Sequence, residues 1–233
     1  MVVAPSIVSL PSPNHADIAL WLIDLDAHPE WCDAPWLSIS EQDRASRFRF
    51  DLHARRYRAS HAALRLILGQ AMGLDPSTLE FTEGTHGKPR LLNINAPCFN
   101  MSHSAGWALV GLCPNHPIGV DIELIAPMAD APLLAQKNFS ASEYAVFLAT
   151  PPDQQLQAFF RCWTRKEACL KALGSGLSIE PHEFEAGLGS LLQRTFIAID
   201  GQACAMTVSS IDLPIPAMAA FAKLADANSP LAM

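Results

Sequence analysis

A strict alternation of apolar and polar positions predicts one strand near the middle of the chain. Val120, Ile122 and Leu124 alternate there with Asp121 and Glu123. A period of two places the apolar side chains on one face of the strand and both carboxylates on the other. Similar patterns predict strands at 17–25, 99–104, 107–112, 184–187, 195–199 and 203–211, the last two joined as a hairpin around Asp200–Gly201.

Apolar positions three and four residues apart predict helices between these strands. One helix is expected over 54–71, ending at Gly73, and Ser40 is a candidate N-cap for a shorter helix before it. Further helices are expected near 140–149 and 153–161, and a separate one starts at Trp163. In that last helix Trp163, Glu167 and Lys171 are four residues apart, so they lie along one side.

The order of strand, helices and strands occurs twice, with a natural break near residue 115. This order predicts the α+β class, with two similar α/β halves at 1–115 and 116–233. Half of the 233 residues are hydrophobic and 17% are charged, which excludes global disorder. No apolar run approaches the ~20 residues that span a bilayer, and no signal peptide is evident.

The six cysteines include no Cys-x-x-Cys pair. This pattern suits reduced thiols in a cytoplasmic protein better than a zinc site, although an even count leaves a disulfide open. The net charge of −7 argues against general affinity for nucleic acid. A basic stretch nevertheless indicates a specific anionic ligand, and it contains Arg44, Arg47, Arg49, Arg55, Arg56, Arg58 and Arg65.

The carboxylates and their neighbours each allow two interpretations. Asp121 and Glu123 could form the solvent face of an edge strand, and Glu167 could close a capping box with Thr164. If the fold brings the three carboxylates together with Lys171, they would instead hold Mg²⁺ beside a phosphate.

The segment Asn100–Ser104 contains a serine and a histidine but is a poor serine-hydrolase site. Ser102 and His103 are adjacent on a strand and point to opposite faces, and no Gly-x-Ser-x-Gly elbow is present. His103 is either a half-buried structural histidine or a donor to phosphate. Lys88 places a cation on a tight loop, and no Walker loop or dinucleotide-binding glycine motif occurs.

The order and spacing of these segments closely resemble the 4′-phosphopantetheinyl transferases. The resemblance rests on Gly119–Glu123 followed by Trp163–Lys171, supported by the arginine-rich helix, Gly87–Pro89 and Asn100–Ser104. It extends over about residues 21–184 and fits the long, monomeric, surfactin-synthetase-type branch of the family. It implies two halves in a pseudo-twofold arrangement, with coenzyme A and Mg²⁺ between an N-terminal coenzyme A-binding half and a C-terminal catalytic half.

By motif position, the resemblance also implies roles for individual residues. Asp121, Glu123 and Glu167 would bind Mg²⁺, and Lys171, His103 and Ser102 would meet the coenzyme A phosphates. The 3′-phosphate and adenine end would be served by Lys88, Arg44 and Arg56. Glu41 stands near a position that is often basic in the family, so no ligand role is carried onto it.

The implied reaction transfers 4′-phosphopantetheine from coenzyme A to a serine hydroxyl of an apo acyl or peptidyl carrier protein and releases 3′,5′-ADP. Glu167 or a metal-bound water would be the base. The carrier could serve fatty-acid, polyketide or nonribosomal-peptide biosynthesis. The alternatives are a Mg²⁺-dependent nucleotide-diphosphate hydrolase and a non-enzymatic module that binds coenzyme A or nucleic acid.

A carrier-docking surface is predicted within residues 125–155, where Phe139 and Phe147 could be exposed, although core packing explains them equally well. Carrier proteins are commonly acidic, so Lys137 and Arg165 are candidate contacts for the carrier. No structure or role is expected for the tail after Ala225.

Overall fold

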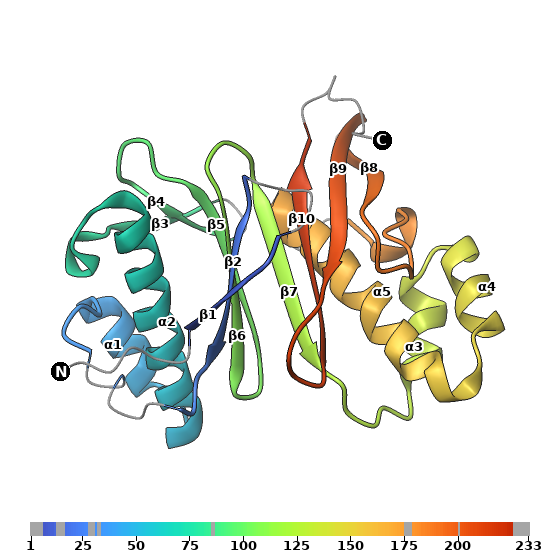
Figure 1. Cartoon of the computed structure of the whole chain (residues 1–233), viewed down its shortest axis with the longest axis horizontal. Coiled ribbons are helices and arrows are strands. Elements are labelled where there is room, and N and C mark those ends of the chain that lie inside the picture. Colours follow the sequence, from blue (N-terminus) through green and yellow to red (C-terminus); the bar gives the residue numbers. More distant parts are fainter. Residues whose placement is uncertain are drawn as a thin grey trace.

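The computed structural model describes residues 7–12, 17–27, 31, 34–84, 87–174, 179–199 and 201–225. It consists of two four-stranded antiparallel sheets, each with a long helix on its outer face (Figure 1). This arrangement confirms the predicted α+β class. No helix in the described part combines the length and apolar character that membrane crossing requires. His86, Cys32 and the tail from residue 226 lie outside the described residues.

Within its described residues, the first half contains six strands, two α-helices and one 3₁₀ helix. In chain order they are β1 (Ile7–Leu10), β2 (Ala19–Asp24), α1 (Ile39–Ser46), α2 (Asp51–Met72), η2 (Pro76–Thr78), β3 (Phe81–Glu83), β4 (Pro89–Leu91), β5 (Cys98–Ser104) and β6 (Trp107–Cys113). Strands β1, β2, β6 and β5 form one sheet in that order, and β3 pairs with β4. Helix α2 ends at Gly73 in the left-handed conformation (φ 67°), which glycine adopts without steric cost.

The described part of the second half contains four strands, three α-helices and one 3₁₀ helix. They are β7 (Ile118–Leu124), α3 (Ala131–Asn138), α4 (Ala141–Ala149), α5 (Pro152–Leu173), the 3₁₀ helix η4 (Pro181–Glu183), β8 (Gln193–Ile199), β9 (Gln202–Ile211) and β10 (Ala217–Leu224). The strand order of this sheet is β7-β10-β9-β8.

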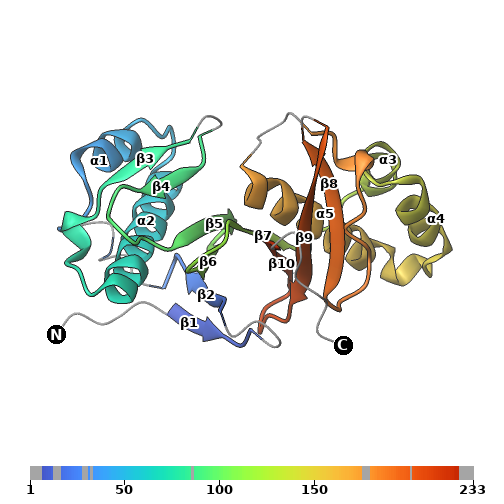
Figure 2. The ribbon, with the colours of Figure 1, turned by 90° about the horizontal axis from the view of Figure 1, so that it is seen from above.

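The two sheets repeat one topology. In the first half, β2 is followed by α2 and then by the hairpin β5–β6, and β6 pairs with β2, which gives the order β2-β6-β5. In the second half, β7 is followed by α5 and then by the hairpin β9–β10, and β10 pairs with β7, which gives the order β7-β10-β9. Figure 2 shows α2 and α5 on opposite sides of the molecule, with β5, β6 and β7 between them. The halves therefore meet along β5, β6 and β7.

Three apolar clusters hold these layers together. One packs α2 against the outer face of the first sheet, and another packs α5 against the outer face of the second. The third lies between the sheets and includes Leu20, Leu22, Leu109, Val120, Ile122 and Phe221. Apolar side chains from both halves thus share one core, as the alternation in β7 requires.

Several element predictions differ from the structure. Residues 152–173 form one continuous helix rather than two, because Pro152 lies in its first turn and no glycine or proline follows before Gly174. Residues 184–187 form no strand, and Ser38 rather than Ser40 caps α1 through a capping box with Glu41. The periodicity of the sequence does not predict β1, β3, β4, α3 or β10.

Candidate functional site

Helix α5 crosses β7 at very short range because Gly119 has no side chain. A Cβ atom at Gly119 would lie 2.1 Å from the carbonyl oxygen of Ala168 and 2.3 Å from the nitrogen of Ala172. No other residue type permits this approach. The contact brings Glu167 and Lys171 of the helix to the face of β7 that carries Asp121.

Asp121 is the most buried of the predicted site residues, with 3% of its surface exposed. The Nζ atom of Lys171 lies 2.5 Å from its Oδ1, and the hydroxyl of Ser102 donates to the same oxygen at 2.9 Å. Lys171 also donates to Ser102 Oγ at 2.9 Å. The second oxygen, Oδ2, is buried without a hydrogen-bond partner among the described residues. Asp121 therefore does not form the solvent face of an edge strand.

Negative charge accumulates around Asp121. Burial raises the pKa of Asp121, Glu123 and Glu167 above the ordinary values. The charge of Asp121 raises the pKa of Glu167 further, as does that of Glu123. Lys171 opposes the rise at all three carboxyls. Lys171 therefore supplies one positive charge to a cluster of three carboxylates, and the cluster would be stabilised by additional positive charge.

Glu167 lies in the middle of α5, so the capping-box interpretation is wrong. Thr164 is twelve residues from the start of the helix at Pro152, and its hydroxyl donates to the carbonyl oxygen of Arg161 at 3.2 Å. Glu167 is thus free of a capping role. Trp163 stacks on Phe159 in an apolar cluster.

Ser102 and His103 point to opposite faces of β5, as expected. Ser102 joins Asp121 and Lys171, whereas His103 follows Phe99 and Met101 on the face toward α2. Desolvation lowers the pKa of His103, and the charge of Lys171 lowers it further. His103 is therefore neutral over more of the pH range than an ordinary histidine.

Lys88 reaches across to the second half of the molecule. Its Nζ donates to the carbonyl oxygens of Ile118 at 2.8 Å and of Ala172 at 3.0 Å, and burial lowers its pKa to about 8. Its ammonium group thus ties the start of β7 to the end of α5.

The arginines of the basic helix have different surroundings. Arg56 binds both carboxylate oxygens of Asp26, at 2.9 and 2.5 Å, and Arg44 lies over the ring of Tyr57 at 5.7 Å. Arg65 is buried and donates to Glu41 and to two main-chain carbonyls. Arg65 is therefore structural, and the structure does not bring Arg44 and Arg56 into contact with the carboxylates.

In the described part of the chain, no group of three or more His, Cys, Asp or Glu side chains stands ready to hold a metal ion. The position beside Asp121 is taken by the ammonium of Lys171. The unpartnered Oδ2 of Asp121 and the oxygen-only donor set nevertheless fit a hard divalent cation.

Comparison with known proteins identifies the family of this chain. The family model of the 4′-phosphopantetheinyl transferase superfamily matches residues 117–211, which include β7 and α5. The 4′-phosphopantetheinyl transferase HetI of Nostoc sp. is 38% identical over 70% of this chain and 70% of its own length. The 4′-phosphopantetheinyl transferase psf-1 of Bacillus pumilus is 35% identical over 76% of each chain. The chain belongs to the 4′-phosphopantetheinyl transferase family.

Among solved structures, the holo-acyl-carrier-protein synthase of Thermotoga maritima matches 46% of this chain and 62% of that chain. The identity is 20% and the TM-score is 0.31, so this match adds nothing to the assignment. The relatives and the family model carry it.

Two further residues of this phosphopantetheinyl transferase lie beside the site and were not among the residues predicted from the sequence. Asn100 and Ser104 share a face of β5 with Ser102 and contact β7, Asn100 at the backbone of Val120 and Ser104 at Glu123. Their spacing of two along a predicted strand was the signal that could have found them.

The surface predicted for docking differs from expectation. Phe139 and Phe147 are buried, with 3% and 1% of their surfaces exposed, and pack in one cluster with Phe159. Arg165 is fully buried and donates to the carbonyl oxygens of Ala186 and Leu191, so it is not a surface contact. Lys137 is exposed.

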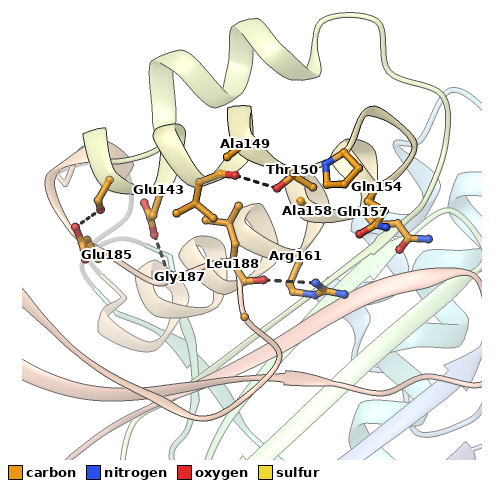
Figure 3. A pocket seen from close by; sticks show the side chains of 14 residues that line it. Glu143, Ala149, Thr150, Gln154, Gln157, Ala158, Arg161, Glu185, Gly187 and Leu188 are labelled. Carbon is orange, nitrogen blue, oxygen red and sulfur yellow. Dashed lines mark hydrogen bonds between the residues drawn. The ribbon is translucent and has the colours of Figure 1, made fainter.

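A cavity of about 710 Å³ lies between α4, the start of α5 and the loop at 185–189 (Figure 3). Thr150, Gln154, Gln157 and Arg161 are among its lining residues, and none of the predicted site residues of the transferase lines it. The cavity is separate from the carboxylate cluster.

Proposed function

We propose that this transferase moves the 4′-phosphopantetheine arm of coenzyme A to a serine hydroxyl of an apo acyl or peptidyl carrier protein. The observation that carries the proposal is the cluster of Asp121, Glu123, Glu167 and Lys171 where α5 crosses β7. The family membership supports the same reaction. The serine oxygen forms a bond to the β-phosphorus, the bond from that phosphorus to the bridging oxygen breaks, and 3′,5′-ADP leaves.

Asp121, Glu123 and Glu167 are the proposed Mg²⁺ ligands. The orphan oxygen of Asp121 and the surplus of negative charge support this assignment. When bound, Mg²⁺ would neutralise charge on the transferring phosphate. Lys171 would then turn from Asp121 toward the pyrophosphate. Its side chain is about one-third exposed, which leaves room for that movement.

Glu167 is the proposed general base. Its half-buried carboxylate lies on the side of α5 that faces Asp121, and it would take the proton of the serine hydroxyl directly or through a water. Ser102 and His103 would donate to the phosphates of coenzyme A. Arg44, Arg56 and Lys88 would serve its 3′-phosphate and adenine end, and Lys88 would have to turn from Ile118 and Ala172 to do so.

Intact masses of several apo carrier proteins, after incubation with the chain, coenzyme A and Mg²⁺, test the proposal. We expect one carrier to gain a phosphopantetheine arm and chelation of Mg²⁺ to stop the gain. Glu167→Gln should lower the turnover by roughly 10²- to 10⁴-fold. The exposed Glu180, changed to Gln, serves as the matched control. If the Glu167→Gln variant modified the carrier protein at the wild-type rate, the role of Glu167 as base would be refuted.

The same experiment separates the alternatives. A hydrolase would release free phosphopantetheine and leave every carrier unmodified. A binding module would hold coenzyme A without any product, and Asp121→Ala would not change its behaviour. Both of those outcomes contradict the transferase proposal.

We further propose that the chain acts as a monomer in the cytoplasm. The five described cysteines, Cys98, Cys113, Cys162, Cys169 and Cys204, are free thiols, which supports a reducing compartment. Light scattering after gel filtration tests the monomer, with a mass of 25.3 kDa expected.

A further inference from the structure

Strands β5 and β7 lie side by side but belong to different sheets. Each is the outermost strand of its own sheet. Side chains of β5 bind the edge of β7: Asn100 Oδ1 accepts from the amide of Val120 at 2.9 Å, and Ser104 Oγ accepts from the amide of Leu124 at 3.2 Å. These two bonds align the first half of the molecule with the strand that carries the carboxylates.

Serine side chains on the same face of β5 also donate hydrogen bonds to the carboxylates of β7. Ser102 Oγ donates to Asp121 Oδ1 at 2.9 Å, and Ser104 Oγ donates to Glu123 Oε2 at 2.8 Å. Ser102 and Ser104 are two residues apart on β5, and their partners Asp121 and Glu123 are two residues apart on β7, so the two strands lie in register. Ser104 is thus bound twice, by the amide of Leu124 and by Glu123, which fixes the direction of its hydroxyl.

The position of Ser104 is set from the first half. It is the last residue of β5 before a two-residue turn, and Ala105 in that turn has a φ of 49°, which is unusual for a residue with a side chain. The carbonyl oxygen of Gly106 accepts from the amide of Leu25 at 2.8 Å. A Cβ at Gly106 would lie 2.6 Å from Asp26 Oδ2, so this turn is tightly seated against the loop after β2.

We propose that Ser104 is a positioning residue that orients the carboxylate of Glu123 for a divalent cation. The inference rests on the proposed role of Glu123 as a Mg²⁺ ligand. Hydrogen bonds to ligating carboxylates fix their direction, and their loss commonly weakens metal affinity 10- to 100-fold. Ser104 does not touch the reacting atoms, and it acts through Glu123 alone.

The test is calorimetric titration of the purified chain with coenzyme A, with and without Mg²⁺ and in the absence of any carrier protein. Wild-type protein should bind coenzyme A more tightly when Mg²⁺ is present. In Ser104→Ala we expect this Mg²⁺-dependent gain to shrink about 10-fold. The affinity without Mg²⁺ should stay at the wild-type value, whereas the midpoint of unfolding should fall modestly, because the amide of Leu124 loses its acceptor. Ser104→Thr, which keeps the hydroxyl, should restore the gain.

Ser9→Ala is the matched control, because Ser9 is an exposed strand serine of β1, away from β7. A wild-type gain in Ser104→Ala would overturn the role of Ser104 while leaving the metal site intact. A loss of metal-free affinity as large as the loss of affinity in the presence of Mg²⁺ would also overturn it, since a purely structural serine predicts equal losses. If wild-type protein itself gains nothing from Mg²⁺, the proposed metal site fails, and the role of Ser104 fails with it.

Discussion

Glu41 is a buried carboxylate that the fold has surrounded with donors. Its Oε2 accepts from the amide of Ser38 and from Nε of Arg65, both at 2.8 Å, and its Oε1 lies 3.1 Å from Nδ1 of His61. Burial would raise its pKa, but these partners lower it to about 2. Glu41 therefore joins α1 to α2 as an anion, and no ligand role was predicted for it.

A carboxyl with a lower pKa in the folded state stabilises the protein above its unfolded pKa of about 4.5, and this contribution is lost as the pH falls toward 2. A shift of that size corresponds to about 3 kcal/mol. We expect Glu41→Gln to be less stable at pH 7 and to lose less stability than wild type between pH 5 and pH 2.5. Urea unfolding at several pH values measures this, with Asp43→Asn on the same helix as control. Parallel curves for Glu41→Gln and wild type would contradict the assignment.

Glu143 and Lys166 form a second buried pair, at 2.7 Å. Glu143 Oε1 also accepts from the amides of Ala186 and Gly187, at 2.7 and 2.8 Å, and Lys166 donates to the carbonyls of Pro181 and Phe184. The pair therefore ties the loop at 181–187 to α4 and α5. Lys166, within the Trp163–Lys171 segment, therefore has structural contacts in this protein.

Removing one partner of a buried ion pair leaves an uncompensated charge. We expect Glu143→Ala to lower the free energy of unfolding by about 3–5 kcal/mol. Hydrogen exchange should show the amides of Ala186 and Gly187 losing protection first. The exposed Glu185, changed to Ala, should cost far less. Similar costs for both variants would show that the pair contributes little.

At the scale of elements, the crossing of α5 over β7 decides whether a site exists. Gly119 permits this crossing, as the short distances to Ala168 and Ala172 show. Gly119→Ala should force α5 away from β7, lowering stability and removing the Mg²⁺-dependent gain in coenzyme A affinity together. Gly189→Ala, where a Cβ meets nothing within 4 Å, should change neither. Calorimetry measures the gain and thermal unfolding measures the stability. A Gly119→Ala variant with wild-type stability and a wild-type gain would contradict this account.

At the scale of the whole molecule, the shared core between the sheets couples the two halves. Leu109 is completely buried there, beside residues of both sheets. We expect Leu109→Ala to cost about 2–5 kcal/mol and to lower the hydrogen-exchange protection of α2 and α5 equally. Unequal loss, or two separate unfolding transitions, would show that the halves unfold independently.

The sequence by itself determined the elements whose periodicity is local. The alternation around Asp121 predicted β7, and the helical spacing predicted most of α2, because each pattern reflects the geometry of a single strand or helix. It also contained the motif order by which the family was identified. It could not reveal β10, whose alanine-rich residues 217–224 have little strand propensity and become a strand by pairing with β7 and β9.

Only the tertiary structure decided what the charged residues contact. Arg165 and Lys88 have sequence contexts like those of surface cations, yet both are bound by carbonyl oxygens from distant segments. The bond from Ser104 to Glu123 likewise depends on two strands that lie in different sheets. The physical reason is that burial and hydrogen-bond partners are properties of residues far apart along the chain. Periodicity, in contrast, depends only on neighbours.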